Sequence, residues 1–189
     1  MNHLPDLTVL MNGSVAAHLS SDSRGHLVLR YDSTYMDAPD AIPLSLAMPF
    51  TERPHGHRAV QRWTQSLLPD NPSVLSRWYD REDVQQRTPF GLLSTAIGLD
   101  CAGAVQFCPV GAEHRLAARS SGIQTLTSQT IRRELSAIVN DPDAWHSDDL
   151  EPYFSLAGFQ SKIALHRVND GWSDLMGAVR DADLVGKTF

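Results

Sequence analysis

The sequence contains only two cysteines, Cys101 and Cys108, among its 189 residues. Two cysteines cannot form a tetrahedral zinc site by themselves, and this spacing is not that of a Cys-x-x-Cys redox pair. A chain of this length can bury a core that folds without disulfides or metals. We therefore expect both thiols to be reduced, as in the cytosol, and buried as small hydrophobic side chains.

Long apolar runs are missing too. No segment approaches the roughly 20 apolar residues that are needed to cross a bilayer. Residues Met1–Leu10 lack the basic stretch followed by a longer apolar one that marks a signal peptide. These absences predict a cytoplasmic protein that does not associate with a membrane.

A basic excess is also absent, because 16 lysines and arginines stand against 22 aspartates and glutamates, for a formal net charge of -6. A general nucleic-acid or membrane-surface binder would need the opposite balance to contact phosphates. The 42% hydrophobic and 20% charged residues are ordinary for a globular chain. The length fits one domain, or one domain and part of another.

The first third of the chain predicts a small antiparallel meander. Residues Leu7–Met11 form a short strand, and Asn12-Gly13 follows as a turn in which both residues tolerate positive φ. A return strand is expected at Val15–Leu19 and a third, alternating strand at His26–Tyr31. Residues Pro43–Pro49 are a fourth candidate, because prolines suit strand ends and edges.

Helical patterns dominate the middle of the chain. After a first amphipathic helix, Asn71 caps a second one that opens with Pro72. Thr88-Pro89 repeats this device, and Gly98 is placed to end the third helix. A fourth helix is expected to begin at Thr127 or Ser128. The apolar residues expected to face inward are Val60, Trp63, Leu67 and Leu68, then Val74, Leu75, Trp78 and Tyr79, then Phe90, Leu93 and Ile97, and finally Ile131, Leu135, Ile138 and Val139.

Extended segments return in the second half. Residues 104–110 and Lys162–Val168 predict strands, and Asn169-Asp170-Gly171 is a hairpin turn. Between them, residues 111–126 are polar and small, which is typical of a linker or surface excursion. The order of elements predicts an α+β fold.

The sequence contains parts of two common motifs, a phosphate-binding Walker loop and a histidine metal site, but neither motif is complete. Gly186-Lys187-Thr188 resembles the end of a phosphate-binding Walker loop, but Asp181 stands where that motif needs its first glycine. His55 and His57 are two residues apart in a loop, with no aspartate, glutamate or cysteine at a helpful offset for a metal. We therefore expect neither a Walker loop nor a metal site.

The segment Ser155–Lys162 is a small-residue turn between extended stretches. Such a turn brings backbone N–H groups close to phosphates, which a nearby lysine or serine also contacts. One glycine, Gly158, is a weak signal by itself. Spacing alone leaves two interpretations open, a phosphate-binding loop and an ordinary β-turn.

Several blocks, taken in order, resemble the HipA family of serine/threonine kinase toxins from bacterial type II toxin–antitoxin systems. The resemblance covers roughly residues 5–172, which is less than half of a full-length family member. The blocks are Met11-Asn12-Gly13, Pro43–Leu46 with Met48-Pro49, Leu67–Asn71, Phe90–Leu93, Ile97–Gln106 and Phe154–Lys162.

The resemblance implies a division of the chain. Residues 1–110 correspond to the family's N-terminal subdomain, a small antiparallel β-barrel-like sheet with helices. Residues 111–172 correspond to a linker helix and the incomplete start of a HipA-like kinase core. Residues 173–189 are a divergent tail, which we interpret as the product of a frameshift or an early stop. Because the rest of the core is missing, we expect a well-ordered body up to about residue 110 and a looser C-terminal third, with Ile131, Leu135, Ile163 and Leu165 partly uncovered.

The resemblance also implies a nucleotide-covering loop. A serine of this loop is autophosphorylated in the family, and Ser155 occupies the matching place. About two negative charges in a phosphate-facing loop would repel ATP. The residues that correspond to the loop are Ser155, Ala157, Gly158, Gln160 and Lys162.

The catalytic part of the family pattern is missing. The sequence has no Asp-Phe-Gly-like or His-Arg-Asp-like stretch, and Lys162 belongs to the loop rather than to the strand of the ATP-contacting lysine. We therefore assign no catalytic or metal-binding residue. ATP and Mg²⁺ belong to the complete family enzyme, and we expect neither to be bound by this chain alone.

Three functions remain open. The first is a truncated HipA-like kinase that is inactive by itself, and the second is an antitoxin-like binding module that regulates a separate HipA-type kinase. The third is an unrelated α+β enzyme. The expected partners are a helix-turn-helix antitoxin of the HipB type or a separate kinase-core chain, with DNA reached only through the antitoxin.

Overall fold

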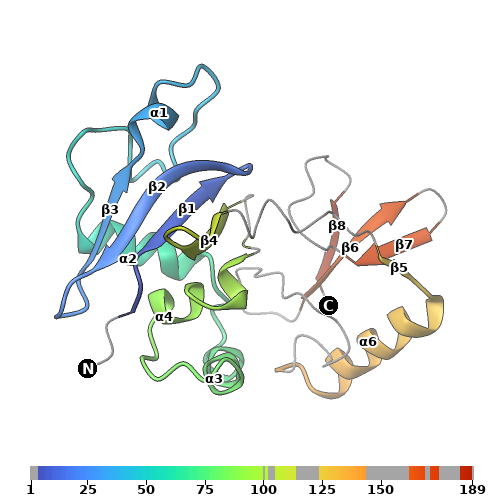
Figure 1. Ribbon diagram of the computed structural model, residues 1–189. Coiled ribbons are helices and arrows are strands. Elements are labelled where there is room, and N and C mark those ends of the chain that lie inside the picture. Colours follow the sequence, from blue (N-terminus) through green and yellow to red (C-terminus); the bar gives the residue numbers. More distant parts are fainter. Residues whose placement is uncertain are drawn as a thin grey trace.

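The computed structural model describes residues 4–99, 101, 105–113, 124–143, 162–168, 171–174 and 184–188. Within these residues the chain forms two separate four-stranded antiparallel sheets with helices beside them (Figure 1). The mixed α and β content agrees with the predicted class. The first sheet contains β1 (Leu7–Met11), β2 (Ser14–Ser21), β3 (Leu27–Tyr31) and β4 (Val105–Pro109), in the order β3-β2-β1-β4.

The β1–β2 hairpin turns at Asn12 and Gly13, as predicted. Their φ angles of 51° and 79° are the positive values that a two-residue hairpin turn requires. The register shifts between Val9 and Leu10, so that Val9 lies opposite Ala17 and Leu10 opposite Val15. Both faces of β1 are buried, with Leu7 and Val9 in the main core and Leu10 in a smaller cluster with Cys108.

The first sheet is open, so the expected barrel-like closure is wrong for the residues described. The edge strands β3 and β4 do not pair with each other. The outer edge of β3 instead pairs at one point, where Leu29 and His55 exchange backbone hydrogen bonds of 3.0 and 2.8 Å. Small barrels take about five to eight strands to close, and four are too few.

The first sheet with its helices, α1 to α4 and η1, forms what we call the first module. Two of these helices begin at the N-cap residues that the sequence predicts. Asn71 accepts a hydrogen bond from the Ser73 N–H at the start of α3, and Thr88 accepts one from the Gly91 N–H at the start of α4. In both helices proline follows at the first position. The elements are α1 (Ser33–Met36), α2 (His57–Ser66), α3 (Pro72–Arg81), α4 (Pro89–Leu93) and the 3₁₀-helix η1 (Ala96–Leu99).

Two elements differ from the prediction. Residues Pro43–Pro49 form no strand but a turn, with a single bridge between Ser45 and Met48. The helix that opens at Thr88 ends at Leu93, and Ile97 lies in η1. Gly98 does not end that helix; a Cβ at this position would lie 1.9 Å from the Leu93 carbonyl oxygen, so glycine permits a close approach of two backbone segments.

The main core lies between one face of the first sheet and α2, α3 and α4 (Figure 1). Val60 and Trp63 of α2 point into it, and the Trp63 ring lies 5.7 Å from that of Phe107 in β4. Leu67 and Leu68 are buried just beyond the end of α2. The sheet alternates as predicted in β3, where Leu27, Leu29 and Tyr31 are buried and the residues between them are exposed.

The second sheet has the order β5-β7-β6-β8 and lies apart from the first, with α6 beside it (Figure 1). Leu126, Ile138 and Leu165 form its buried cluster, with Ile131 and Leu135 partly buried against it. Val139 is 72% exposed, so its predicted inward position is wrong; one residue after Ile138, it is rotated about 100° round the helix. The elements are β5 (Gln124–Leu126), α6 (Ser128–Asn140), β6 (Lys162–Val168), β7 (Gly171–Asp174) and β8 (Leu184–Thr188).

The second sheet refines two expectations. The segment expected to be a linker ends in β5, which pairs with β7. Gly186-Lys187-Thr188 lies in β8, antiparallel to β6, so it belongs to an extended strand rather than to a phosphate-binding loop. The strand at Lys162–Val168 is confirmed, and the pairing of Val168 with Gly171 confirms the hairpin. The proposed boundaries at residues 110 and 172 stay predictions.

Candidate functional site

The predicted nucleotide loop lies almost wholly outside the described residues. Ser155, Ala157, Gly158 and Gln160 belong to the part that the structure does not describe. Lys162 is the first residue of β6, and its backbone lies opposite Thr188 of β8. The nucleotide-binding role of this loop and the autophosphorylation of Ser155 therefore stay predictions.

A turn at Leu44–Met48 is held rigidly against the first sheet. The buried Tyr31 hydroxyl donates to the Met48 carbonyl at 2.7 Å and accepts from the Leu44 N–H at 2.9 Å. The Met48 N–H also donates to the Ser45 carbonyl at 2.9 Å. Burial raises the pKa of Tyr31, so the hydroxyl keeps the proton that it donates.

The same clamp fixes what the turn exposes. Met48 is fully buried, whereas Leu46, two residues earlier, is 100% exposed. The Phe50 ring packs edge-on against Tyr31 at 5.0 Å, and a ring nitrogen of His55 lies 2.9 Å from the Pro49 carbonyl oxygen. A fully exposed leucine is thus presented by an anchored turn.

Two arginines of α2 face this turn across a hollow of about 430 Å³. Arg58 and Arg62 are one helical turn apart, both are exposed, and α2 carries no acidic residue. Among the described residues, no carboxylate forms an ion pair with either guanidinium. The hollow is lined by Ser45, Ala47, Arg58, Ala59, Arg62, Trp63 and Ser66.

This arrangement was not predicted from the sequence. The spacing of Arg58 and Arg62 on a helix without aspartate or glutamate was a readable signal in the sequence. That Ser45 and Ala47 form the opposite wall follows only from the tertiary path of the turn. We call this hollow, together with Leu46 at its rim, the arginine groove.

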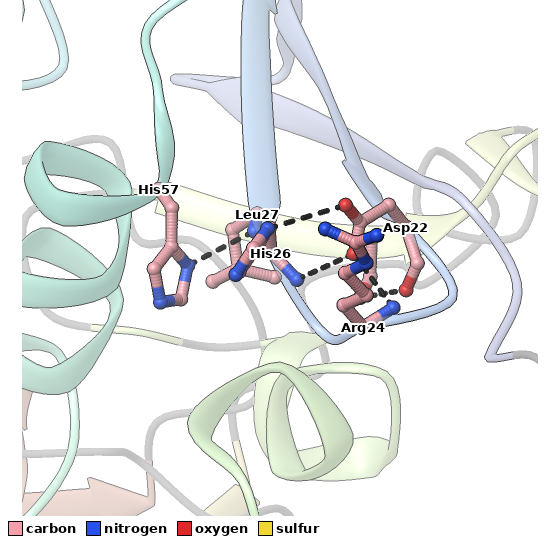
Figure 2. A network of polar contacts seen from close by, with 6 residues as sticks. Asp22, Arg24, His26, Leu27 and His57 are labelled. Atoms are coloured by element: carbon pink, nitrogen blue, oxygen red, sulfur yellow. Dashed lines mark hydrogen bonds and ion pairs between the residues drawn. The ribbon is translucent and has the colours of Figure 1, made fainter.

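A second polar network joins the β2–β3 turn to α2 (Figure 2). The Asp22 carboxylate accepts from the backbone N–H groups of Arg24 and His26, both at 2.8 Å, and its other oxygen lies 3.3 Å from Nδ1 of His26. The hydrogen bond from the His26 N–H is the main cause that lowers the pKa of Asp22. Nδ1 of His57 accepts from the Leu27 N–H at 3.0 Å, which docks the start of α2 on β3.

The opposite face of the first sheet carries a polar strap. The Thr8 hydroxyl donates to the Glu113 carboxylate at 2.5 Å, and the Gly111 N–H donates to the same oxygen at 3.0 Å. These bonds, the one from Thr8 first, lower the pKa of Glu113. Burial, and to a lesser extent Glu113, raises the pKa of Cys108 to about 11, so this thiol is a buried apolar group rather than a nucleophile. Neither cysteine forms a disulfide and both are buried, as predicted.

Polar contacts link α3 to the end of α6. The Asn71 side-chain amide, which also caps α3, donates to the Asp143 carboxylate at 2.8 Å. Arg77 donates to the Asp141 carboxylate at 2.7 Å, and this bond lowers the pKa of Asp141 and raises that of Arg77. The two segments are joined by side chains more than 60 residues apart in the sequence.

The described residues contain no cluster of three or more histidine, cysteine, aspartate or glutamate side chains that could hold a metal ion. His55 and His57 have separate roles there, at Pro49 and at Leu27. In the part of the chain that the structure describes, none of the helices combines the length and the hydropathy of a membrane span.

Comparison with known proteins relates the chain to a protein family and to a kinase-like relative. The family model described as "HipA N-terminal domain" matches residues 7–108. The chain is also 29% identical over 161 residues to "Putative kinase Y4mE" of Sinorhizobium fredii (strain NBRC 101917 / NGR234). That alignment covers 84% of this chain and 37% of Y4mE, so the chain spans little more than a third of this relative.

The matched range coincides with the first sheet and its helices. It begins at the first residue of β1 and ends in β4, the two strands that pair along their whole length. The matched residues therefore include both edges of the sheet and the main core. This chain belongs to the HipA N-terminal domain family.

Proposed function

We propose that this chain acts as the N-terminal regulatory part of a HipA-like serine/threonine kinase toxin and transfers no phosphate by itself. The observation that carries the proposal is the family match over residues 7–108, which coincides with the first sheet and its core. The alignment with Y4mE, whose name describes a kinase, extends beyond that range. The absence of kinase-type catalytic stretches from the sequence supports inactivity in isolation.

The proposal includes the partners and cofactors of a complete enzyme. ATP and Mg²⁺ would be bound by a kinase core, with Ser155, Ala157, Gly158, Gln160 and Lys162 covering the nucleotide. A helix-turn-helix antitoxin of the HipB type would bind the kinase and contact DNA on its behalf. We place the protein in the cytoplasm, where its two free cysteines stay reduced.

A phosphorylation assay tests the proposal. The purified chain is incubated with γ-labelled ATP and Mg²⁺, next to full-length Y4mE as the reference and a Ser155→Ala variant as the matched control. We expect no label on this chain under conditions that label the reference. Label on the chain that disappears in the Ser155→Ala variant would show activity in isolation and overturn the proposal.

A second candidate function is an antitoxin-like module that binds a separate HipA-type kinase. It is favoured by the main core, whose described buried members all lie between Leu7 and Phe107. Co-expression with a HipA-type kinase that lacks its own N-terminal domain tests it. Rescue of growth from the toxicity of that kinase, together with co-purification of the two chains, would support this function. Elution of the two chains separately in size-exclusion chromatography would contradict it.

A further inference from the structure

We propose that the arginine groove is a docking site for an acidic peptide segment of a partner protein, centred on an apolar side chain. The groove comprises Arg58, Arg62, Trp63, Ser45 and Ala47, with Leu46 at its rim. This inference does not depend on the proposed kinase function, because it concerns only the surface of the first module.

The charge of the groove favours an acidic ligand. The chain has a net charge of -6, yet α2 presents two exposed arginines and no acidic residue beside the groove. Arg77 and Arg87 meet the carboxylates of Asp141 and Asp80, whereas no described carboxylate forms an ion pair with Arg58 or Arg62. Two guanidinium groups one helical turn apart match carboxylates spaced along a peptide.

The second feature is the exposed apolar surface. Leu46 is 100% exposed, and Ala47, Ala59 and Trp63 contribute apolar surface to the lining of the hollow. A single exposed leucine is ordinary by itself, but the Tyr31 hydroxyl bonds to the turn at both Leu44 and Met48 and fixes where this one is presented. A rigid apolar contact at the rim loses little conformational entropy when a partner covers it.

These two features together select the occupant. A nucleic acid is disfavoured, because its phosphates call for a broad basic surface and the chain has a net charge of -6. A small anion would use the guanidinium groups and leave Leu46 uncovered. A peptide with an apolar residue between carboxylates uses the arginines, the apolar lining and Leu46 at once.

The test is an NMR titration of the full ¹⁵N-labelled chain. The probe is the blocked peptide acetyl-Glu-Glu-Asp-Leu-Leu-Asp-Glu-Glu-amide, with a lysine-for-acid version and a serine-for-leucine version as matched controls. We expect amide shifts confined to the Leu44–Met48 turn and α2. We also expect affinity that falls as salt rises, and at least about tenfold weaker binding of either control peptide.

Variants assign the shifts to named groups. Arg58→Glu with Arg62→Glu should weaken the acidic peptide by about tenfold or more, and Leu46→Ser by about threefold to tenfold. Arg24→Glu with Arg30→Glu is the control, because it changes the net charge equally on exposed residues outside the groove. We expect that control to stay within about twofold of the unmodified chain.

Several outcomes would overturn the inference. These are the absence of shifts in the groove, equal binding of the lysine peptide, and equal loss in the two double-arginine variants. Inorganic phosphate or a ten-nucleotide thymidine strand that gives the same shifts, with no effect of Leu46→Ser, would replace peptide docking by simple anion binding. A dispersed amide spectrum for each variant shows that the fold is kept.

Discussion

The two sheets of this protein have the same number of strands but are stabilised differently. The first sheet packs one face against α2, α3 and α4 and buries residues from all four strands and those helices. In the described part of the second region, the buried cluster joins Leu126 and Leu165 of the sheet to Ile138 of α6. Burial of apolar area is the dominant favourable contribution to folding, so of the two described clusters that of the first module contributes more to the stability.

The described side-chain contacts between the two regions are hydrogen bonds and an ion pair rather than apolar packing. Asn71–Asp143 and Arg77–Asp141 are polar, and the second pair is about half exposed on both sides. Exposed ion pairs contribute little to the free energy of unfolding. The comparison thus indicates a module that folds by its own core and a second sheet attached to it by directional contacts.

The largest expected effect comes from the same substitution made in each core. Leu19→Ala in β2 removes a fully buried side chain from the large core, and we expect it to lower the free energy of unfolding by about 3–5 kcal/mol. Leu165→Ala in β6 acts on a side chain that is 9% exposed in a small cluster, and we expect a loss of about 2 kcal/mol. Urea denaturation followed by circular dichroism measures both values.

Amide hydrogen exchange shows where each of these losses is felt. Leu19→Ala should raise exchange throughout the first sheet and its helices, whereas Leu165→Ala should raise it only in the second sheet and α6. If both substitutions raised exchange equally throughout the protein, the protein would fold as one cooperative unit, and the two sheets would not be separately stabilised.

An intermediate effect is expected at Asn71, which serves both regions. Asn71→Ala removes the α3 cap and the bond to Asp143, and we expect a loss of about 1–2 kcal/mol. Asn71→Asp keeps an oxygen for the cap but places a carboxylate against that of Asp143. Hydrogen exchange should therefore rise in the last turn of α6 and stay unchanged in α3; a rise confined to α3 would contradict this role.

The smallest effect is expected from Arg77→Gln, and it depends on pH. The pKa of Asp141 is lowered in the folded protein by the bond from Arg77, so the contribution of this pair is present above the unfolded pKa. It is lost as pH falls through the lowered folded pKa. We therefore expect a small decrease in the urea midpoint at pH 7 relative to the unmodified chain, and no difference at about pH 2. A difference that persists unchanged at about pH 2 would assign the effect to packing of the side chain.

Much of the local structure follows from the sequence because neighbouring residues decide it. Asn12-Gly13 supplies the positive φ angles of its turn, and Asn71-Pro72 and Thr88-Pro89 supply the caps of α3 and α4. Errors arose where distant residues decide the conformation. Residues Pro43–Pro49 have a strand-like composition, but the Tyr31 hydroxyl binds both ends of the segment and holds it as a turn.

The candidate sites also differ in whether nearby or distant residues decide them. The family resemblance was readable from ordered blocks of sequence, and the match over residues 7–108 agrees with it. The arginine groove was not readable, because Arg58 and Arg62 acquire a ligand-sized space only when Ser45 and Ala47 are brought opposite them. The nucleotide loop at Ser155–Lys162 stays a prediction from sequence.

The sequence by itself determined the family, the turns and the helix caps, because each depends on residues close together in the chain. The tertiary structure decided that the first sheet stays open, that Gly186-Lys187-Thr188 is a strand, and that Leu46 is exposed beside two arginines. Each of these depends on pairing between segments far apart in the sequence. Local periodicity contains no information about which distant edge, hydroxyl or backbone a segment will meet.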